Sequence, residues 1–270
     1  MRTLLTLVIF YLFLIMPKLS RKEKQKPFEK VYLAHRGLFN NKDIPENSLS
    51  AFKKAVENGY GMELDVQLTT DGKLVVFHDA SLLRICGVDK ILTECSYDEL
   101  LKYNLLNTNE KIPLFTDVLD VLKPDTPLII EIKPEGPFIE TTKKVVELMK
   151  TYDRTYSMES FNPDVVEYLR KNNPEIIRGQ LSENYFNEEE GNLSNFKKFV
   201  LTYLLLNFIT RPDYIAYDIK NMNNLSFRLI SKLFNGECVA WTVKSEEDLK
   251  KANEYYQCII FDSFIPKEKR

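Results

Sequence analysis

From residue 31 to the end of the chain, short β-branched or aromatic runs alternate with longer amphipathic stretches. Eight runs have the length and composition of strands: residues 31–35, 61–66, 128–133, 155–161, 176–181, 214–219, 238–243 and 258–261. Five stretches between them have helical periodicity: residues 48–58, 139–152, 163–172, 226–234 and 246–255. This alternation predicts an α/β chain with a parallel sheet, and eight units in about 240 residues predict a closed (β/α)8 barrel, the TIM barrel.

One segment after the second strand departs from this alternation. Residues 67–78 consist of two extended arms joined by Asp71-Gly72, and Asp-Gly is typical of a tight hairpin turn. Parallel neighbours need a crossover of about a dozen residues, so the second arm is not a ninth barrel strand. We predict a β-hairpin insertion that returns His78 towards Asp65.

Residues 194–209 are a second departure, because apolar side chains occupy nearly every position from Phe199 to Ile209. Two interpretations remain open for this segment. It is either a buried barrel helix or an interfacial lid that touches lipid or an acyl chain.

The N-terminal segment differs in composition from the rest of the chain. Residues 3–16 carry no charge, and as a helix they would extend roughly 21 Å, short of the ~30 Å hydrocarbon core. Residues 17–19 would make the span marginal, that is, barely a transmembrane helix. Neither a small-x-small cleavage site nor a lipobox cysteine follows, so we expect an uncleaved hydrophobic anchor. The alternative is a signal peptide whose removal would leave a secreted enzyme.

A basic flank follows this segment and bears on its orientation. Its cationic residues are Lys18, Arg21, Lys22, Lys24 and Lys26. Positive charge stays on the cytoplasmic side and also suits anionic head groups, so we expect a membrane-anchored protein with a cytoplasmic catalytic domain. The predicted organisation is an anchor with its basic flank at 1–26 and a barrel domain at 27–270.

Charge and cysteine usage exclude several classes of function. Lys and Arg number 37 against 39 Asp and Glu, a net charge of -2 that argues against a nucleic-acid partner. The four cysteines form no C-x-x-C pair, so neither a disulfide framework nor a zinc knuckle is readable. Only two histidines, His35 and His78, are available for proton transfer.

Ionisable residues interrupt the apolar strands near their carboxyl ends, where barrel enzymes carry their catalytic groups. Glu63 and Asp65 are two residues apart and therefore face the same way, and Glu131 with Lys133 repeats this spacing. Converging carboxylates repel one another unless a cation lies between them, which indicates an oxygen-lined Mg²⁺ or Ca²⁺ site. The alternative is a salt-bridge network completed by Arg36 and Lys133. Two histidines beside such a group resemble an acid and a base around a phosphate.

These residues lie in motifs that resemble the glycerophosphodiester phosphodiesterase family. The motifs are His35-Arg36-Gly37, Pro45-Glu46-Asn47-Ser48, Glu63-Leu64-Asp65-Val66-Gln67-Leu68-Thr69, Val75-Val76-Phe77-His78-Asp79, Glu131-Ile132-Lys133, Ser160-Phe161, Trp241-Thr242-Val243 and a final Asp262. The resemblance extends from about residue 31 to the last strand. Lys244 stands where the family often has Asn.

The resemblance implies a role for each of these positions. Glu63, Asp65 and Glu131 would hold one divalent cation, Mg²⁺ or Ca²⁺, with Glu46 beside it. His35 and His78 would be the acid–base pair, and Arg36 and Lys133 would bind phosphate oxygens. Trp241 would line the pocket, although a strand tryptophan is as often core. Asp79 would either orient His78 or cap the following turn.

The expected activity is metal-dependent hydrolysis of glycerophosphodiesters to glycerol 3-phosphate and an alcohol. The alternative is a membrane-associated lysophospholipase D acting on lysophospholipids. Two other classes compete with these readings. One is a membrane-tethered binding barrel without turnover. Such a barrel would lack at least one member of a group of five residues, none of which is missing: His35, His78, Glu63, Asp65 and Glu131. The other is a different metal-dependent barrel enzyme such as a sugar isomerase, whose site would draw more on histidine.

Overall fold

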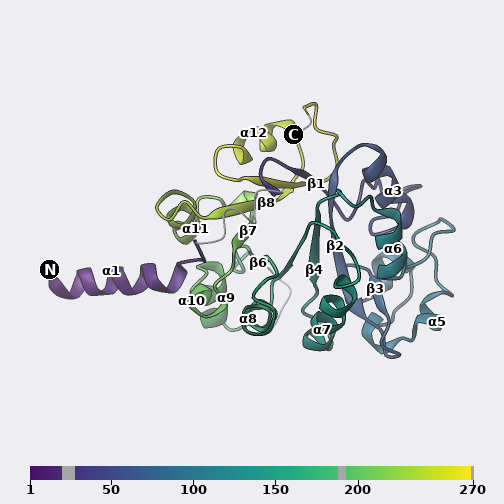
Figure 1. Cartoon of the computed structure of the whole chain (residues 1–270), viewed down its shortest axis with the longest axis horizontal. Coiled ribbons are helices and arrows are strands. Elements are labelled where there is room, and N and C mark those ends of the chain that lie inside the picture. The colour runs from purple at the N-terminus through teal and green to yellow at the C-terminus, as the bar shows by residue number, and fades with distance from the viewer. Residues whose placement is uncertain (20–27, 188–192, 269–270) are drawn as a thin grey trace.

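The computed structural model describes residues 1–19, 28–187 and 193–268. Within these ranges, eight parallel strands close into a barrel surrounded by helices (Figure 1). The barrel strands are β1 (Tyr32–His35), β2 (Gly61–Leu68), β4 (Leu128–Ile132), β5 (Tyr156–Ser160), β6 (Arg178–Ser182), β7 (Tyr214–Asp218), β8 (Glu237–Val243) and β9 (Cys258–Phe261). The sheet closes because β1 pairs with both β2 and β9. The predicted (β/α)8 barrel and its eight strands are confirmed.

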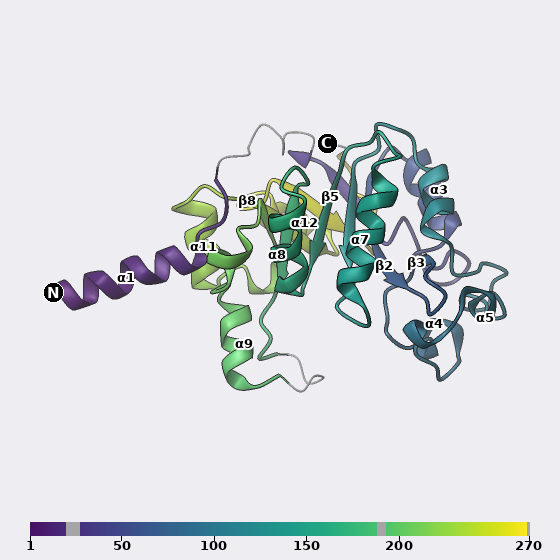
Figure 2. The same ribbon diagram turned by 60° about the horizontal axis from the view of Figure 1, so that its bottom comes forward.

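The longer helices lie outside the barrel, as the apolar periodicity predicts. Those with a predicted counterpart are α3 (Leu49–Glu57), α7 (Phe138–Met149), α8 (Pro163–Asn172), α11 (Leu225–Lys232) and α12 (Glu246–Ala252). Helix α6 (Phe115–Val121) was not among the predicted segments. In Figure 2, α7 and α8 stand side by side, and α8 covers β5 and β6. Local signals set their starts: Ser48 accepts a hydrogen bond from Ala51 N, and Asn162 caps the helix that begins at Pro163.

The predicted hairpin is confirmed and opens an insertion. Strand β3 (Leu74–Val76) pairs antiparallel with β2, with Val76 opposite Val66. Three short helices follow: α4 (Leu83–Cys86), the 3-10 helix η2 (Leu92–Glu94) and α5 (Tyr97–Leu100). They cover a small apolar cluster of their own, which includes Phe77 and Leu92. The sequence did not predict these helices, since one-turn segments have too few residues to show a period.

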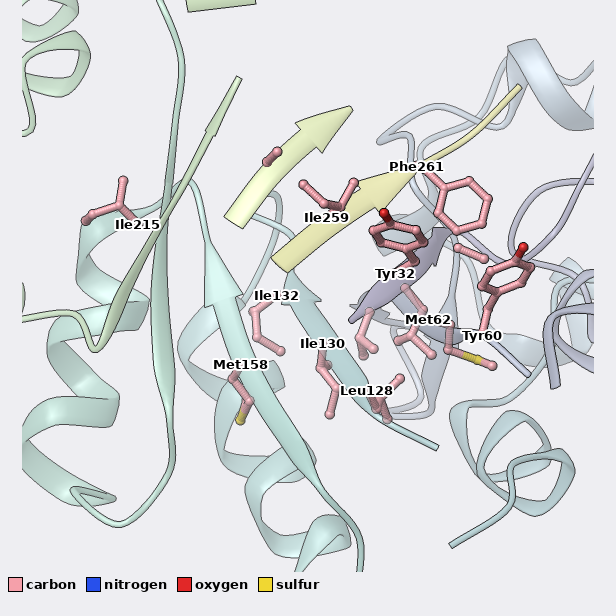
Figure 3. Packing of buried hydrophobic residues seen from close by; sticks show 14 of the residues in the cluster. Tyr32, Tyr60, Met62, Leu128, Ile130, Ile132, Met158, Ile215, Ile259 and Phe261 are labelled. Carbon is pink, nitrogen blue, oxygen red and sulfur yellow. The ribbon is translucent and has the colours of Figure 1, made fainter. Parts of the chain in front are cut away.

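Along each barrel strand, successive side chains point alternately outwards, to the core beneath the helices, and inwards, to the barrel interior. Met62 and Ile130 point outwards into the main apolar cluster beneath the helices (Figure 3). Glu63, next to Met62, therefore faces the barrel interior. Glu63 and Asp65 are both almost fully buried. Ionisable side chains therefore occupy interior positions of β2 where a barrel normally has Val, Ile or Leu.

Residues 194–209 form two short helices separated by a turn. They are α9 (Asn195–Thr202) and α10 (Asn207–Thr210). The side chains of Phe196 and Phe199 in α9 are 75% and 45% exposed, so the expectation of a buried barrel helix is wrong for α9. An apolar sequence alone does not show whether a helix is buried against the barrel or exposed on its surface.

The N-terminal segment folds as helix α1 (Arg2–Ile15), which projects from the barrel in both Figure 1 and Figure 2. Only its carboxyl end is packed: Ile15 is fully buried, and the rings of Phe13 and Phe208 lie 5.8 Å apart. Among the residues that the structure describes, no helix combines the length and apolar character needed to cross a membrane. The transmembrane helix expected from this segment is therefore not found, because α1 ends after 14 residues. Of the basic flank, Arg21, Lys22, Lys24 and Lys26 lie outside the described residues.

Candidate active site

Strand register brings three carboxylates together inside the barrel. His35 pairs with Glu63 across β1 and β2, and Asp65 pairs with Glu131 across β2 and β4. Oxygens of Glu63, Asp65 and Glu131 all lie within 4.8 Å of one another, and all three residues are buried. The predicted convergence of these carboxylates is confirmed.

Burial and mutual repulsion set the charge of this group. Desolvation, followed by the charges of Asp65 and Glu131, raises the pKa of Glu63 well above its usual value. Desolvation also raises the pKa of Glu131. Burial alone would raise the pKa of Asp65 as well, but the neighbouring cations, Lys133 first, hold that pKa below its usual range. Ionising all three carboxyl groups at once is unfavourable unless additional positive charge lies beside them.

Two predicted phosphate-binding residues supply part of that charge. The Nζ atom of Lys133 lies 2.8 Å from Glu131 Oε1 and 3.4 Å from Asp65 Oδ1, and Arg36 Nε lies 3.4 Å from Asp65 Oδ2. The salt-bridge interpretation is thus correct in part. Asp65 Oδ1 is nevertheless buried and has no hydrogen-bond partner among the described residues. A buried, under-satisfied oxygen within a three-carboxylate group fits a divalent cation.

His35, at the carboxyl end of β1, is held by Asp262, which follows β9. The distance from His35 Nδ1 to Asp262 Oδ2 is 2.9 Å, and His35 Nε2 lies 3.9 Å from Glu63 Oε2. Burial, reinforced by the charge of Arg36, lowers the pKa of His35 to about 4, against the opposing effect of Asp262. The imidazole is therefore neutral near pH 7, and with Nδ1 donating to Asp262 its Nε2 carries the free lone pair.

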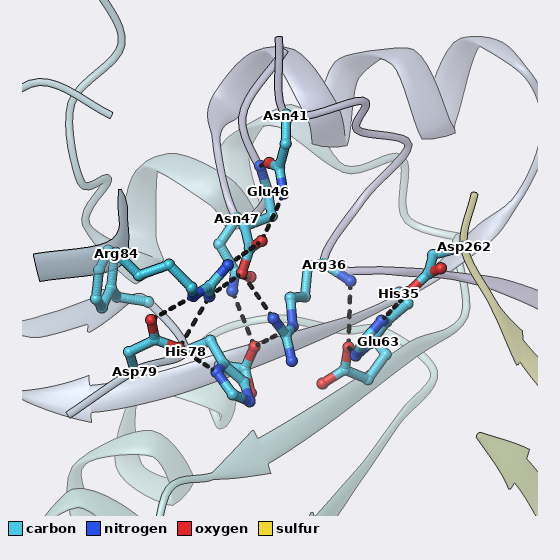
Figure 4. A network of polar contacts seen from close by, with 12 residues as sticks. His35, Arg36, Asn41, Glu46, Asn47, Glu63, His78, Asp79, Arg84 and Asp262 are labelled. Atoms are coloured by element: carbon cyan, nitrogen blue, oxygen red, sulfur yellow. Dashed lines mark hydrogen bonds and ion pairs between the residues drawn. The ribbon is translucent and has the colours of Figure 1, made fainter. Parts of the chain in front are cut away.

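His78 follows β3 at the end of the hairpin and has a carboxylate of its own. Its Nδ1 lies 2.6 Å from Asp79 Oδ1, while Arg84 donates to both oxygens of Asp79 (Figure 4). Burial alone would raise the pKa of Asp79, but hydrogen bonds from His78 and Arg84 lower it below the usual range. Of the two roles expected for Asp79, the structure favours the orientation of His78.

Glu46 lies on the arginine side of the network rather than within the three-carboxylate group. Its oxygens accept hydrogen bonds from Arg36, Arg84 and Asn41. Burial alone would raise the pKa of Glu46, but these donors, Arg84 first, outweigh it and lower the pKa to about 2. A ligand role for Glu46 stays a prediction. In Figure 4, Arg36 lies between the two histidines and links Glu46 to the carboxylates.

Trp241 in β8 belongs to an aromatic wall on the same end of the barrel. Its ring meets Phe161 edge to face with centroids 5.3 Å apart, and Phe161 meets Tyr185 at 6.5 Å. Trp241 is half-buried, and its Nε1 atom is buried without a hydrogen-bond partner among the described residues. It is not simply core, although its contact with substrate stays a prediction.

Sequence reasoning missed several supporting residues. Asn47 donates to Asp65 Oδ2 over 2.9 Å, and Gln67 Nε2 donates to the carbonyls of Phe77, His78 and Asp79. Gln67 continues the two-residue spacing of Glu63 and Asp65, and this spacing was the signal that could have identified it.

Glu159 in β5 is a fourth interior carboxyl that the sequence analysis did not single out. It pairs with Glu131 in register and accepts a 2.8 Å hydrogen bond from the Tyr214 hydroxyl. Desolvation raises the pKa of Glu159 to about 8. This carboxyl is therefore protonated near neutral pH and adds no negative charge beside the three clustered carboxylates.

Comparison with known proteins agrees with this geometry. Residues 35–264 match the glycerophosphoryl diester phosphodiesterase family. Human lysophospholipase D GDPD1 is 32% identical over 185 residues, which cover 63% of this chain and 57% of the human protein. The uncharacterized protein YqiK of Bacillus subtilis is 30% identical over 249 residues, covering 87% of this chain and 95% of that protein.

Solved structures resemble the chain over most of its length. The crystal structure of the glycerophosphodiester phosphodiesterase from Thermotoga maritima has a TM-score of 0.66 at 26% identity, covering 86% of this chain and 94% of that chain. The family match spans both histidines and all three clustered carboxylates. The chain therefore belongs to the glycerophosphoryl diester phosphodiesterase family and is a phosphoric diester hydrolase.

Proposed function

We propose that the chain hydrolyses glycerophosphodiesters to glycerol 3-phosphate and an alcohol, using one divalent cation, Mg²⁺ or Ca²⁺. One observation carries the proposal: three buried carboxylates within 4.8 Å of one another lie beside two histidines, each bonded to its own carboxylate. Family membership gives the reaction class, and this arrangement supplies the groups that the reaction needs.

Glu63, Asp65 and Glu131 would hold the cation, since their oxygens converge and Asp65 Oδ1 lacks a hydrogen bond. When bound, a divalent cation neutralises the non-bridging oxygens of the phosphate. Arg36 and Lys133 add donors beside the same carboxylates, so a phosphate placed there meets positive charge from two further side chains.

Proton transfer is divided between the two histidines. The neutral His35 has its Nε2 free and removes the proton of the attacking oxygen. His78, whose Nδ1 is held by Asp79, delivers a proton from Nε2 to the departing alcohol. The alcohol then leaves without developing the full charge of an alkoxide. Gln67 and Arg84 fix the hairpin end that carries His78.

A second substrate class, lysophospholipids, is favoured by two observations. Phe196 and Phe199 are exposed on α9, which follows the carboxyl end of β6. The human relative is named a lysophospholipase D. We propose that α9 receives the acyl chain of a lysolipid while the headgroup ester enters the same site.

The proposed location is a membrane surface, with α1 as the attachment and the catalytic domain on the cytoplasmic side. Exposed apolar residues on α1 support attachment, and the lysines and arginines of residues 18–26 support the orientation. Retention of Met1 in the mature membrane-bound protein is expected. A mature chain that begins after the segment would instead indicate secretion.

The test uses the full chain in detergent with glycerophosphocholine, glycerophosphoethanolamine and a lysophospholipid as parallel substrates. Each is assayed with Mg²⁺, with Ca²⁺ and with chelator, alongside His78→Ala and the matched control Lys73→Ala on the same hairpin. We expect release of choline or ethanolamine that requires a cation and falls by about 10²–10⁴-fold in His78→Ala only. No release with either cation would contradict the proposal.

A further inference from the structure

A basic cavity lies at the base of α1, away from the candidate active site. Its volume is about 560 Å³, and its lining includes Lys18, Arg170, Arg178 and Arg211. Its remaining lining residues, Met16, Pro17 and Leu19, come from the segment that follows α1. No lining residue that the structure describes is acidic.

The arginines of this cavity are not equivalent. Arg178 is fully buried and committed to the fold: its Nη1 lies 3.4 Å from Asp213 Oδ2, and its Nη2 donates to the carbonyl of Arg211 over 2.7 Å. Arg170 makes only a distant contact, 3.8 Å, with Glu167, and its Nε is buried without a hydrogen-bond partner among the described residues. Arg211 makes no ion pair with any carboxylate in the described ranges. Arg170 and Arg211 thus retain charge that a ligand could use.

The position of the cavity relative to α1 is fixed by hydrogen bonds. Asn207 Nδ2 donates to the carbonyl of Ile15, Arg211 Nη1 donates to that of Met16, and Lys18 N donates to that of Pro212. The Arg211 guanidinium also lies 5.3 Å from the centroid of the Phe13 ring. The cationic groups therefore sit immediately beyond the last turn of α1.

The free length of α1 exposes apolar side chains on all sides. Seven are between 46% and 67% exposed: Leu4, Leu5, Leu7, Val8, Ile9, Phe10 and Phe13. A helix that packs on a protein keeps a polar face towards water, whereas a helix that is apolar all round is typical of hydrocarbon surroundings. An exposed apolar patch of this kind marks a membrane or partner site, and the absence of a polar face favours lipid.

We propose that this cavity binds the phosphate group of an anionic phospholipid, with Arg170 and Arg211 as its ligands. This inference rests on the membrane attachment proposed above. With α1 in the hydrocarbon, the residues directly after it lie at the level of the head groups. Guanidinium groups bind phosphate through paired hydrogen bonds, so two arginines at this depth suit a lipid phosphate.

The site is separate from the catalytic one. Arg178 begins β6 and Arg211 precedes β7, so the cavity lies at the amino ends of the strands, opposite the end that carries His35 and Glu131. A lipid bound there is not the substrate. It would hold the barrel at the membrane while the catalytic end stays open.

The test is cosedimentation of the full chain with phosphatidylcholine vesicles, prepared with and without phosphatidylglycerol at one salt concentration. We compare Arg170→Gln, Arg170→Gln/Arg211→Gln and a matched control of equal charge, Lys150→Gln/Lys171→Gln, whose side chains are exposed outside the cavity. The wild type and the matched control should bind phosphatidylglycerol vesicles more tightly than neutral ones. Each arginine removed should weaken that preference about fivefold. Arg170→Gln alone serves as the second variant, because Arg211 also contacts α1.

Three outcomes would overturn the inference. Binding could be indifferent to phosphatidylglycerol, or the matched control could lose as much affinity as the double arginine variant. Inorganic phosphate could also compete with phosphatidylglycerol vesicles for the protein as effectively as the lipid itself binds, which would assign the site to free phosphate. Hydrolysis of glycerophosphocholine is measured on the same preparations. Equal rates in the wild type and the arginine variants show that the variants are folded, and absence of turnover in all of them contradicts the proposed function without altering the vesicle result.

Discussion

His35 and His78 are each held by a carboxylate, but in different surroundings. His35 is enclosed at the end of β1 against Asp262, and its pKa is lowered to about 4 by burial first. His78 stands on the hairpin end with Asp79, which Arg84 also holds. In the proposed mechanism, the two histidines would differ in role because their surroundings differ, not because of residue type.

Asp262 should act as a positioning residue for His35. Asp262→Asn removes the carboxylate that accepts from Nδ1, so the ring can turn or take the other tautomer, and kcat should fall about 100-fold with little change in KM. Steady-state kinetics on glycerophosphocholine measure this split. Ser263→Ala is the matched control, since the Ser263 hydroxyl donates to Asp262 Oδ1 and not to the oxygen that faces His35, and its kcat should stay near the wild-type value. Equal loss in both variants would contradict the role.

Glu159 should make stability depend on pH. Its folded pKa is about 8, whereas an unfolded glutamate titrates near about 4.3. Between these values the folded chain keeps a proton that the unfolded chain has lost, so the free energy of unfolding falls as pH rises, by up to about 1.4 kcal/mol per unit. Below the lower value the contribution is complete, and it is lost as pH rises through the folded pKa.

Glu159→Gln keeps the shape and the hydrogen bond to Tyr214 while removing the titration. Urea unfolding of the wild type and the variant at about pH 5 and about pH 8, with chelator present, measures the difference. The variant should lose less stability between the two pH values than the wild type. An equal loss in the two proteins would show that Glu159 is not protonated in the folded state.

Residue-level expectations were right where strand spacing and motif agreed. Glu63, Asp65 and Glu131 converge because β2 and β4 pair in parallel with Asp65 opposite Glu131, and the two-residue spacing of Glu63 and Asp65 is visible in the sequence. The partnership of Glu46 with Arg84 was not foreseeable, since 38 residues separate them and the insertion brings them together.

Among the elements, the hairpin that carries His78 is held from inside the barrel by the side chain of Gln67, in addition to the contacts of Arg84. Gln67 bonds three successive carbonyls of the hairpin end from inside the barrel. Gln67→Ala should lower kcat about tenfold, because His78 is held less well, and should cost about 1–3 kcal/mol of unfolding free energy. Gln257→Ala is the matched control, as Gln257 accepts from Cys238 N at the amino ends of the strands. It should lose stability but keep kcat, and a similar kcat loss in both variants would contradict the assignment.

Helix α9 should matter for lipid substrates only. Phe196→Ser/Phe199→Ser removes exposed apolar surface without opening the core, so hydrolysis of lysophospholipid should fall about tenfold or more, while hydrolysis of glycerophosphocholine should not change. Leu101→Ser, at a 40% exposed position in the insertion, is the control. Parallel loss on both substrates, or on neither, would contradict a lipid role for α9.

Helices and strands were predictable where their apolar side chains recur with the period of the element. All eight barrel strands and the helices α3, α7, α8, α11 and α12 correspond to predicted segments, because each buries one face against the sheet. The one-turn helices of the insertion were missed for lack of a period. The choice between a buried and an exposed helix at residues 194–209 stayed open, because an apolar sequence alone does not show what covers it.

For the molecule as a whole, the barrel separates two chemistries at its two ends. The carboxyl ends of the strands carry carboxylates and histidines, and the amino ends of β6 and β7 border the basic cavity beside α1. Sequence charge counting gave a nearly neutral chain with a net charge of -2, which conceals this segregation. Only the fold brings Arg170 and Arg211 to one place.

In the proposed function, phosphodiester hydrolysis requires one divalent cation held by Glu63, Asp65 and Glu131. The most direct measurement strips the full chain with chelator and adds back Ca²⁺ or Mg²⁺ while bound cation and glycerol 3-phosphate release are followed together. Release should rise with occupancy and saturate at one cation per chain, and Asp65→Asn should neither bind nor turn over. Undiminished release from a chain shown to contain no cation would contradict this requirement.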